Sequence, residues 1–201
     1  MLSTTSFRRS ALPFAAAAVA LAGLLTACGG AEPAKPVAVT SSVPPASAAA
    51  PAPQAGQVPA VAKTQGWLKI YDGPAPAGAN AVQLNVTSNP SVGQYVSDGA
   101  GRSLYRFDKD TANPSASNCA GQCAVTWPPL TVARNQSIYV AGVDPQRVGF
   151  IERADGACQV TVGGWPVYYF GKDKNAGDLL GQGVGGTWFA VAPSGGKATA
   201  S

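Results

Sequence analysis

A six-residue pattern occurs twice in this chain and restricts the folds that the chain can adopt. The pattern is Tyr-x-Phe-x-x-Asp, found in SLYRFDKD at 103–110 and in PVYYFGKD at 166–173. A Gly and then an Asp-Gly pair precede each copy, and a Trp that opens a short Pro-containing segment follows each copy. Landmarks that recur in the same order indicate an internal repeat, here of about 40 residues. We place the first copy at about 92–130 and the second at about 148–193.

Residue alternation within the copies is typical of β-strands. The segment ACQVTV at 157–162 alternates as a half-buried strand does. Asp155-Gly156 before it and Gly163-Gly164 after it are two-residue turn signals. Gly and Pro interrupt every segment longer than about ten residues, which disfavours helices. The sequence therefore predicts an all-β fold, an antiparallel meander built from two tandem repeats.

The repeated motif has two interpretations. In the structural one, each Tyr and Phe share a strand face and bury their rings, while each Asp accepts backbone N–H groups of the following turn. In the functional one, the aromatic and acidic side chains form a pseudo-symmetric cleft for a sugar or a peptide ring. The candidate binding residues are Tyr105, Phe107, Asp110, Tyr168, Tyr169, Phe170 and Asp173.

The start of the chain has the features of an export signal. Arginines precede an apolar run at 11–25, and LTAC follows at 25–28. This order resembles a bacterial lipobox, in which a signal peptide at 1–27 is removed and Cys28 receives acyl chains such as palmitate. Several acyl chains on one residue anchor a protein stably without crossing the membrane. We expect Cys28 to be the lipidation site and the membrane to be a partner through that anchor.

The lipobox resemblance also predicts a location. Gly follows Cys28 where an inner-membrane lipoprotein of a Gram-negative cell would have Asp. We expect a lipid-anchored protein of the cell envelope. In a Gram-negative source, the expected place is the outer membrane, facing the periplasm or the cell surface.

Composition divides the rest of the mature chain into a linker, a domain and a tail. The segment 28–63 is rich in Pro and Ala and has no periodic apolar pattern, so it is expected to be a disordered tether. Residues 64–193 are enough for one repeat domain with its own core. Residues 194–201 are expected to be a disordered tail.

The landmarks of 92–193 resemble those of a known family. The matching pieces are DGAGRSLYRFDKD, the C-x-x-x-C-A-x-x-W-P-P-L run at 119–130, and GWPVYYFGKD followed by GDLLGQGVGGTWFAVAP. Together they resemble the bacterial lipoproteins and secreted proteins that carry a "secreted repeat of unknown function" with a Y-x-(F/W/Y)-x-x-D motif. Cys158 departs from that pattern. The resemblance implies an exported repeat domain and no established activity.

The cysteines of an exported domain meet an oxidising compartment, where disulfides form. Cys119 and Cys123 are close enough in sequence to bridge locally, and a bridge from Cys158 to either of them is the alternative. If the local bridge forms, Cys158 is expected to be a small buried strand residue. Zinc held by three thiolates and an Asp is a further alternative. The chain has no His, so c-type haem attachment has no ligand, and we expect no metal and no cofactor.

Charge and residue types also limit the function. The chain has 14 Lys and Arg against 10 Asp and Glu with no basic cluster, so we expect no nucleic-acid binding. Without His, the Ser-His and Cys-His nucleophile pairs are excluded, and Asp108 with Asp110 has the pattern of an ordinary turn-edge charge pair. We predict no catalytic residues and a non-enzymatic binding or structural module, whose partner is an envelope protein or a glycan. The alternative is a thiol-based redox or metal-handling envelope protein.

Overall fold

The computed structural model describes residues 59–200. The predicted signal peptide, Cys28 and the linker up to residue 58 lie outside the described residues, so their roles stay predictions. Within 59–200, no helix is long and apolar enough to cross a membrane.

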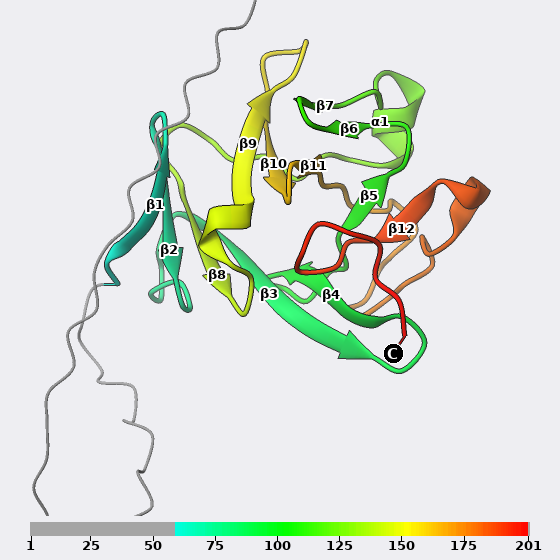
Figure 1. The fold of residues 1–201 in the computed structure, drawn as a ribbon, viewed down its shortest axis with the longest axis horizontal. Helices are drawn as coiled ribbons and strands as arrows, with labels where there is room; N and C mark the ends of the chain where they lie inside the picture. The colour runs from blue at the N-terminus through cyan, green and yellow to red at the C-terminus, as the bar shows by residue number, and fades with distance from the viewer. Residues whose placement is uncertain (1–58, 201) are drawn as a thin grey trace, which may run out of the picture. The chain divides into compact units, whose positions relative to one another are not determined.

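The five-stranded sheet has the order β1-β2-β8-β3-β4 (Figure 1). One hairpin consists of β1 (Val61–Gln65) and β2 (Leu68–Asp72), and a second consists of β3 (Ala81–Asn89) and β4 (Gly93–Asp98). Between them lies β8 (Ser137–Ala141), which pairs parallel with both β2 and β3.

The parallel pairing of β8 corrects one part of the predicted meander. The all-β class is confirmed, and the hairpins are antiparallel as expected. However, the chain reaches β8 only after the whole first copy of the repeat, so no tight turn sets an antiparallel direction. A crossover connection of a dozen or more residues permits parallel pairing.

The second repeat begins with a three-stranded antiparallel sheet. Its strands β9 (Val148–Glu152), β10 (Cys158–Val162) and β11 (Trp165–Pro166) are neighbours in chain order. The connecting turns lie at the predicted Asp-Gly and Gly-Gly pairs, where Gly156 and Gly164 have φ of 80° and 83°. Glycine adopts this left-handed conformation without a steric penalty. This part of the predicted meander is confirmed.

Strands of the two repeats pair directly with each other. The first aromatic motif supplies β5 (Tyr105–Phe107), which pairs antiparallel with β12 (Trp188–Ala190) from the end of the second repeat. Tyr105 also exchanges backbone hydrogen bonds with Tyr168, at 2.8 Å in one direction and 2.9 Å in the other. The two copies are therefore interleaved and share one core.

Short elements connect the first motif to β8 and carry the loops around the core. The hairpin of β6 (Thr111–Ala112) and β7 (Ser115–Ala116) leads into α1 (Gln122–Thr126). The 3-10 turns η1 (Pro145–Arg147) and η2 (Val184–Gly186) precede β9 and β12 respectively. Figure 1 shows α1 beside the β6–β7 hairpin.

The domain begins before the predicted boundary at residue 64. β1 starts at Val61, and its Lys63 donates from Nζ to the carbonyl oxygen of Val148 at 2.6 Å. Residues 61–63 are Val, Ala and Lys, and their strand character comes from pairing with β2, which composition does not reveal.

The C-terminal tail is ordered through residue 200, so the predicted disordered tail at 194–201 is wrong for its described residues. Ala198 is only 3% exposed, and its N–H donates to the carbonyl of Ala190 at 2.8 Å. A turn at Pro193–Ser194 reverses the chain after β12, so that Lys197 forms an antiparallel β-bridge with Val191. The composition of this segment is typical of loops, but the burial of Ala198 and its backbone hydrogen bond to Ala190 hold it against the domain.

The core has an aliphatic and an aromatic part. The aliphatic part joins the five-stranded sheet to β9 and β10, with Leu68, Ile70, Val140, Val148 and Val160 all fully buried. The aromatic part contains both copies of the motif. Its aromatic members are Tyr95, Tyr105, Phe107, Trp127, Tyr168, Phe170 and Trp188.

Candidate functional site

Four aromatic rings form a continuous stack between the repeats. Phe107 of the first copy stacks on Trp188 of the second, with ring centroids 4.2 Å apart. Phe170 of the second copy stacks on Trp127 of the first, also at 4.2 Å. The two indoles stack on each other at 3.9 Å with their planes 1° apart. Each Phe therefore packs on the Trp of the other copy.

The tyrosines and aspartates of the motif also pair across the two copies. The hydroxyl of Tyr105 donates to Asp173 Oδ2 at 2.6 Å, and that of Tyr168 donates to Asp110 Oδ2 at 2.6 Å. The other oxygen of each Asp accepts a backbone N–H of the following loop, from Leu180 at 3.1 Å in one copy and from Asn118 at 2.7 Å in the other. Each Asp thus holds its own loop and the Tyr of the other copy.

Burial changes the ionisation of these pairs. Desolvation, followed by the neighbouring carboxylate, raises the pKa of Tyr105 and Tyr168 far above that of free tyrosine. Desolvation also raises the pKa of Asp110 and Asp173, opposed by the hydrogen bonds that each carboxylate accepts. Both hydroxyls therefore stay protonated at neutral pH and act as fixed donors.

The structure places most of the predicted cleft residues in the core. Tyr105 and Tyr168 have no exposed surface, and Phe107, Asp110 and Phe170 are buried. These residues are brought together as expected, but the partner rings and loops of the other copy cover most of them, and only Tyr169, Phe170 and Asp173 line a hollow. Only the remaining two candidates, Tyr169 and Asp173, are partly exposed.

A hollow of about 500 Å³, called the hairpin hollow below, lies beside this core. Residues of the segment 115–124 form one wall, and residues 151–155 at the end of β9 form the other. Most of the lining side chains are small, among them Ala116, Ala120 and Ala124.

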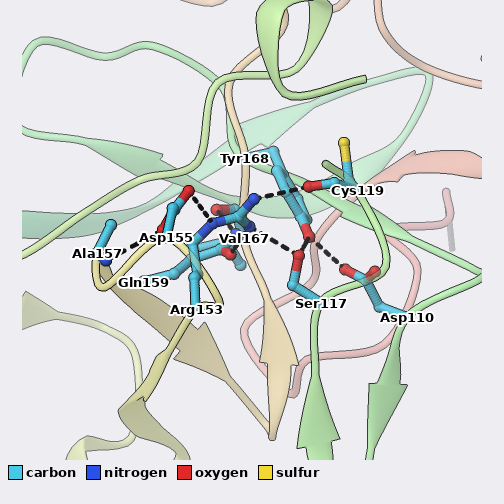
Figure 2. A network of polar contacts seen from close by, with 9 residues as sticks. All are labelled: Asp110, Ser117, Cys119, Arg153, Asp155, Ala157, Gln159, Val167 and Tyr168. Carbon is cyan, nitrogen blue, oxygen red and sulfur yellow. Dashed lines mark hydrogen bonds and ion pairs between the residues drawn. The ribbon is translucent and has the colours of Figure 1, made fainter. Parts of the chain in front are cut away.

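Arg153 lines the hairpin hollow, and its side chain is only 5% exposed. Figure 2 shows its polar contacts. Its Nη1 donates to Ser117 Oγ at 2.7 Å and also to the amide oxygen of Gln159. Its Nη2 donates to the carbonyl oxygen of Cys119 at 2.7 Å, and its Nε contacts Asp155 at 3.4 Å. This one guanidinium joins the two walls of the hollow.

The network continues from the hollow into the core. Ser117 Oγ lies 2.7 Å from the hydroxyl of Tyr168, which in turn donates to Asp110 (Figure 2). Sequence analysis did not identify Arg153, Ser117 or Gln159. The bonds of Ser117 to Arg153 and Tyr168 join distant parts of the chain, and an Arg beside a hairpin turn is ordinarily a solvated charge.

The disulfide forms part of the wall of the hairpin hollow. Cys119 and Cys123 are bonded, as the local alternative predicted. Cys158 is buried on β10 and has no disulfide partner among residues 59–200. The bridge from Cys158 to the loop is therefore excluded, and its expected role as a small buried strand residue is confirmed.

A second hollow of about 220 Å³, called the tyrosine hollow below, borders the other Tyr–Asp pair. Asp173 and Tyr169 line it, together with Arg102. The Arg102 guanidinium lies 4.0 Å above the Tyr169 ring and pairs with Asp98 at 2.7 Å. Tyr169 donates to the same Asp98 at 3.0 Å, and burial raises the pKa of its hydroxyl. The side chains around this hollow are thus largely occupied with one another.

Two other candidates from the sequence are a metal site and the carboxylate pair of Asp108 and Asp110. No group of three or more His, Cys, Asp or Glu side chains there is placed to hold a metal ion. Asp108 forms ion pairs with Lys197 at 2.6 Å and Arg106 at 3.2 Å, whereas Asp110 is buried in the Tyr168 network. The two carboxylates have separate structural partners.

A comparison with protein families confirms the predicted resemblance. The model of the family described as "secreted repeat of unknown function" matches residues 86–131 and 149–192. These bounds agree closely with the copies predicted at about 92–130 and 148–193. No curated protein and no solved structure shows a significant match to the chain.

Proposed function

Because the chain contains two copies of the secreted repeat of unknown function, we propose that it is an exported, non-enzymatic binding module whose ligand occupies the hairpin hollow. The observation that carries this proposal is Arg153, a buried charge that lines an open hollow and joins its two walls. The family description supports an extracytoplasmic location. The lipid anchor on Cys28, and the outer membrane in a Gram-negative source, belong to the same proposal.

The hairpin hollow has the properties of a preformed ligand site. Its volume of about 500 Å³ lies within the usual range of about 300–1,000 Å³. The Cys119–Cys123 disulfide and the Arg153 hydrogen bonds fix the two walls before any ligand arrives. A preorganised site loses less conformational entropy on binding than a flexible one.

The ionisable groups support binding over catalysis. The carboxylates with raised pKa, Asp110 and Asp173, are both engaged by buried tyrosine hydroxyls. The pKa of Asp155 at the rim is lowered, first by the hydrogen bond that it accepts from the Ala157 N–H. A general base at neutral pH needs a pKa near 7, and a carboxylate with a lowered pKa is a poor one.

The alternative is thiol chemistry at the three cysteines of the repeat domain. Cys158 is the residue on which that alternative depends, because the other two are bonded. Mass spectrometry of the full chain after treatment with an alkylating reagent discriminates between the two functions. Rapid alkylation of native Cys158, or a stoichiometric metal, would favour redox or metal handling.

Filling the hairpin hollow tests the binding proposal. Ala116 is exposed and lines the hollow, so Ala116→Trp would occupy it without disturbing the core. Ala77 is exposed in the loop before β3, and Ala77→Trp is the matched control. Envelope glycans and peptides of envelope proteins are screened against the full chain. The expected result is a ligand that binds the wild type and Ala77→Trp alike but binds Ala116→Trp at least tenfold more weakly. Equal affinity in all three proteins would contradict the proposal.

A further inference from the structure

The outer edge of β9 is covered in an unusual way. β10 occupies one edge of β9, and the other edge has no strand beside it. There, the side-chain amide of Gln65 accepts from the Phe150 N–H at 3.0 Å and donates to the Phe150 carbonyl at 3.1 Å. The Lys63 ammonium binds the Val148 carbonyl. Side chains of β1 therefore stand in for a neighbouring strand.

The side chains of Lys63 and Gln65 bind β9 at Val148 and Phe150, whereas the strand continues to Glu152. Backbone groups of alternate residues face the same edge of an antiparallel strand, so Glu152 faces outward as Phe150 does. The N–H of Arg153 donates inward to the Ala157 carbonyl at 2.9 Å, which agrees with this alternation. Cys158, which lies opposite Glu152 on β10, directs its carbonyl away from β9 and accepts from the Val132 N–H at 2.9 Å. The alternation therefore points the backbone N–H and C=O of Glu152 to the outer edge, where no bond to another described residue is found outside the ladder. Glu152 also lines the hairpin hollow.

The lining of the hollow suits an added strand. A strand lies about 4.8 Å from its neighbour and points its side chains to alternate faces. The opposite wall presents Ala116 and Ala120, whose methyl groups leave room for the side chains of a bound segment. The described lining contains no aromatic side chain on which a sugar ring could stack.

The rim of the hollow is acidic. Glu152 and Asp155 are 62% and 61% exposed, while the charge of Arg153 is buried among its hydrogen bonds. Arg134 contacts Glu152 at 3.8 Å, and both side chains are exposed, so this pair is weak and easily exchanged. A basic side chain is the complement of such a rim.

We propose that the hairpin hollow binds an extended peptide segment of a partner protein, which adds to the edge of β9 at Glu152 and places a Lys or Arg beside Glu152 and Asp155. This inference rests on the proposed function and specifies its ligand. Main-chain hydrogen bonds supply affinity in strand addition, and side-chain pockets supply specificity.

A pair of peptide libraries tests the inference on the full chain. The probes are acetyl-Xaa-Xaa-Lys-Xaa-Xaa-amide and the same library with Glu at the centre, with binding followed by fluorescence and by the amide resonance of Glu152. We expect binding only from the Lys library and a shift of that resonance. The best Lys peptide should lose at least tenfold in affinity when its backbone is N-methylated next to the Lys. Equal binding of the methylated peptide would overturn strand addition.

Two variants separate the failure of this inference from the failure of the proposed function. Glu152→Gln keeps the backbone and should weaken the Lys peptide severalfold, whereas Ala116→Trp should abolish its binding. If no Lys peptide binds but a glycan binds in a manner sensitive to Ala116→Trp, the peptide inference is wrong and the site stands. If Lys peptides bind Ala116→Trp as well as the wild type, the hollow is not the site and both proposals fail.

Discussion

The indole rings of Trp127 and Trp188 stack at 3.9 Å with their planes 1° apart, one ring from each copy of the repeat. Outside this pair, each indole packs on the Phe of the other copy. Stacked aromatic pairs add about 0.5–1.5 kcal/mol beyond the burial of their surface. The two copies therefore stabilise each other through one shared stack, and neither has a complete aromatic core of its own.

The hydroxyls of Tyr105 and Tyr168 can be tested separately from their rings. Tyr168→Phe leaves the buried carboxylate of Asp110 without this donor, and Tyr105→Phe does the same to the partly exposed Asp173, so each should lower the free energy of unfolding by about 1–3 kcal/mol. Removing the whole ring, in Tyr105→Ala or Tyr168→Ala, should cost about 3 kcal/mol or more. Urea denaturation of the full chain measures both.

The control for this pair is Tyr71→Phe. Tyr71 is partly exposed and stacks on Tyr139, and no side-chain hydrogen bond is made by its hydroxyl within the described residues. Its loss should change stability by less than about 0.5 kcal/mol. Wild-type stability of both Tyr105→Phe and Tyr168→Phe would show that the exchanged hydrogen bonds do not hold the repeats together.

The carboxylates of the two motifs predict a pH dependence of stability. Asp110 and Asp173 have a raised pKa in the folded state, so the folded protein binds protons more tightly there than the unfolded chain. This tighter proton binding adds to the free energy of unfolding. The added stability is fully present below the unfolded pKa of about 4 and is lost as pH rises through the higher folded pKa. Asp110→Asn removes one titrating group. Its unfolding free energy should therefore fall less than that of the wild type as pH rises from about 4 to 7, and parallel curves would contradict the assignment.

Much of the fold could be predicted from local patterns. The Asp-Gly and Gly-Gly turns, the strand at 157–162 and the burial of Tyr105 and Phe107 all depend on residues close in sequence. An internal repeat does not specify whether Tyr105 bonds the Asp of its own copy or that of the other. The exchange with Asp173 depends on how the copies pack, so sequence spacing could not reveal it.

The candidate site was harder to predict than the fold. Arg153 connects Ser117 and Cys119 of one loop with Gln159 of β10, two different parts of the chain. No periodicity or motif relates these positions. The lone Arg before a hairpin turn is an ordinary surface pattern, and only the interleaved packing of the copies buries it.

Arg153 should be the charged residue on which the structure of the hairpin hollow most depends. Arg153→Met keeps a long side chain but leaves several buried acceptors unpaired, so we expect a loss of about 3 kcal/mol. The control is Arg134→Met, because the Arg134 side chain is 69% exposed and its loss should cost less than about 0.5 kcal/mol. Thermal and urea unfolding measure both, and equal stability of the two variants would contradict a structural role for the buried guanidinium.

Lipidation predicts the distribution of the protein between cell fractions. Cys28→Ser removes the acyl acceptor in the LTAC sequence, so the protein should move from the membrane fraction to the soluble fraction. Acyl chains contribute about 0.8 kcal/mol per buried methylene. Cys158→Ser is the control and should stay with the membrane. Retention of Cys28→Ser on the membrane would place the anchor elsewhere.

Two truncations locate the true start of the domain. The composition of 28–63 predicts a disordered tether, but β1 begins at Val61, and its Lys63 and Gln65 bind the edge of β9. A chain that begins at residue 59 keeps these contacts and should melt at the same temperature as the full mature chain.

A chain that begins at residue 66 loses the strand that pairs with β2 and exposes the carbonyls of Val148 and Phe150. Each uncovered backbone bond costs about 1 kcal/mol, so this chain should melt several degrees lower. If the two truncated chains melt alike, β1 is an accessory strand; if both melt far below the full chain, part of the segment before residue 59 contributes to the fold.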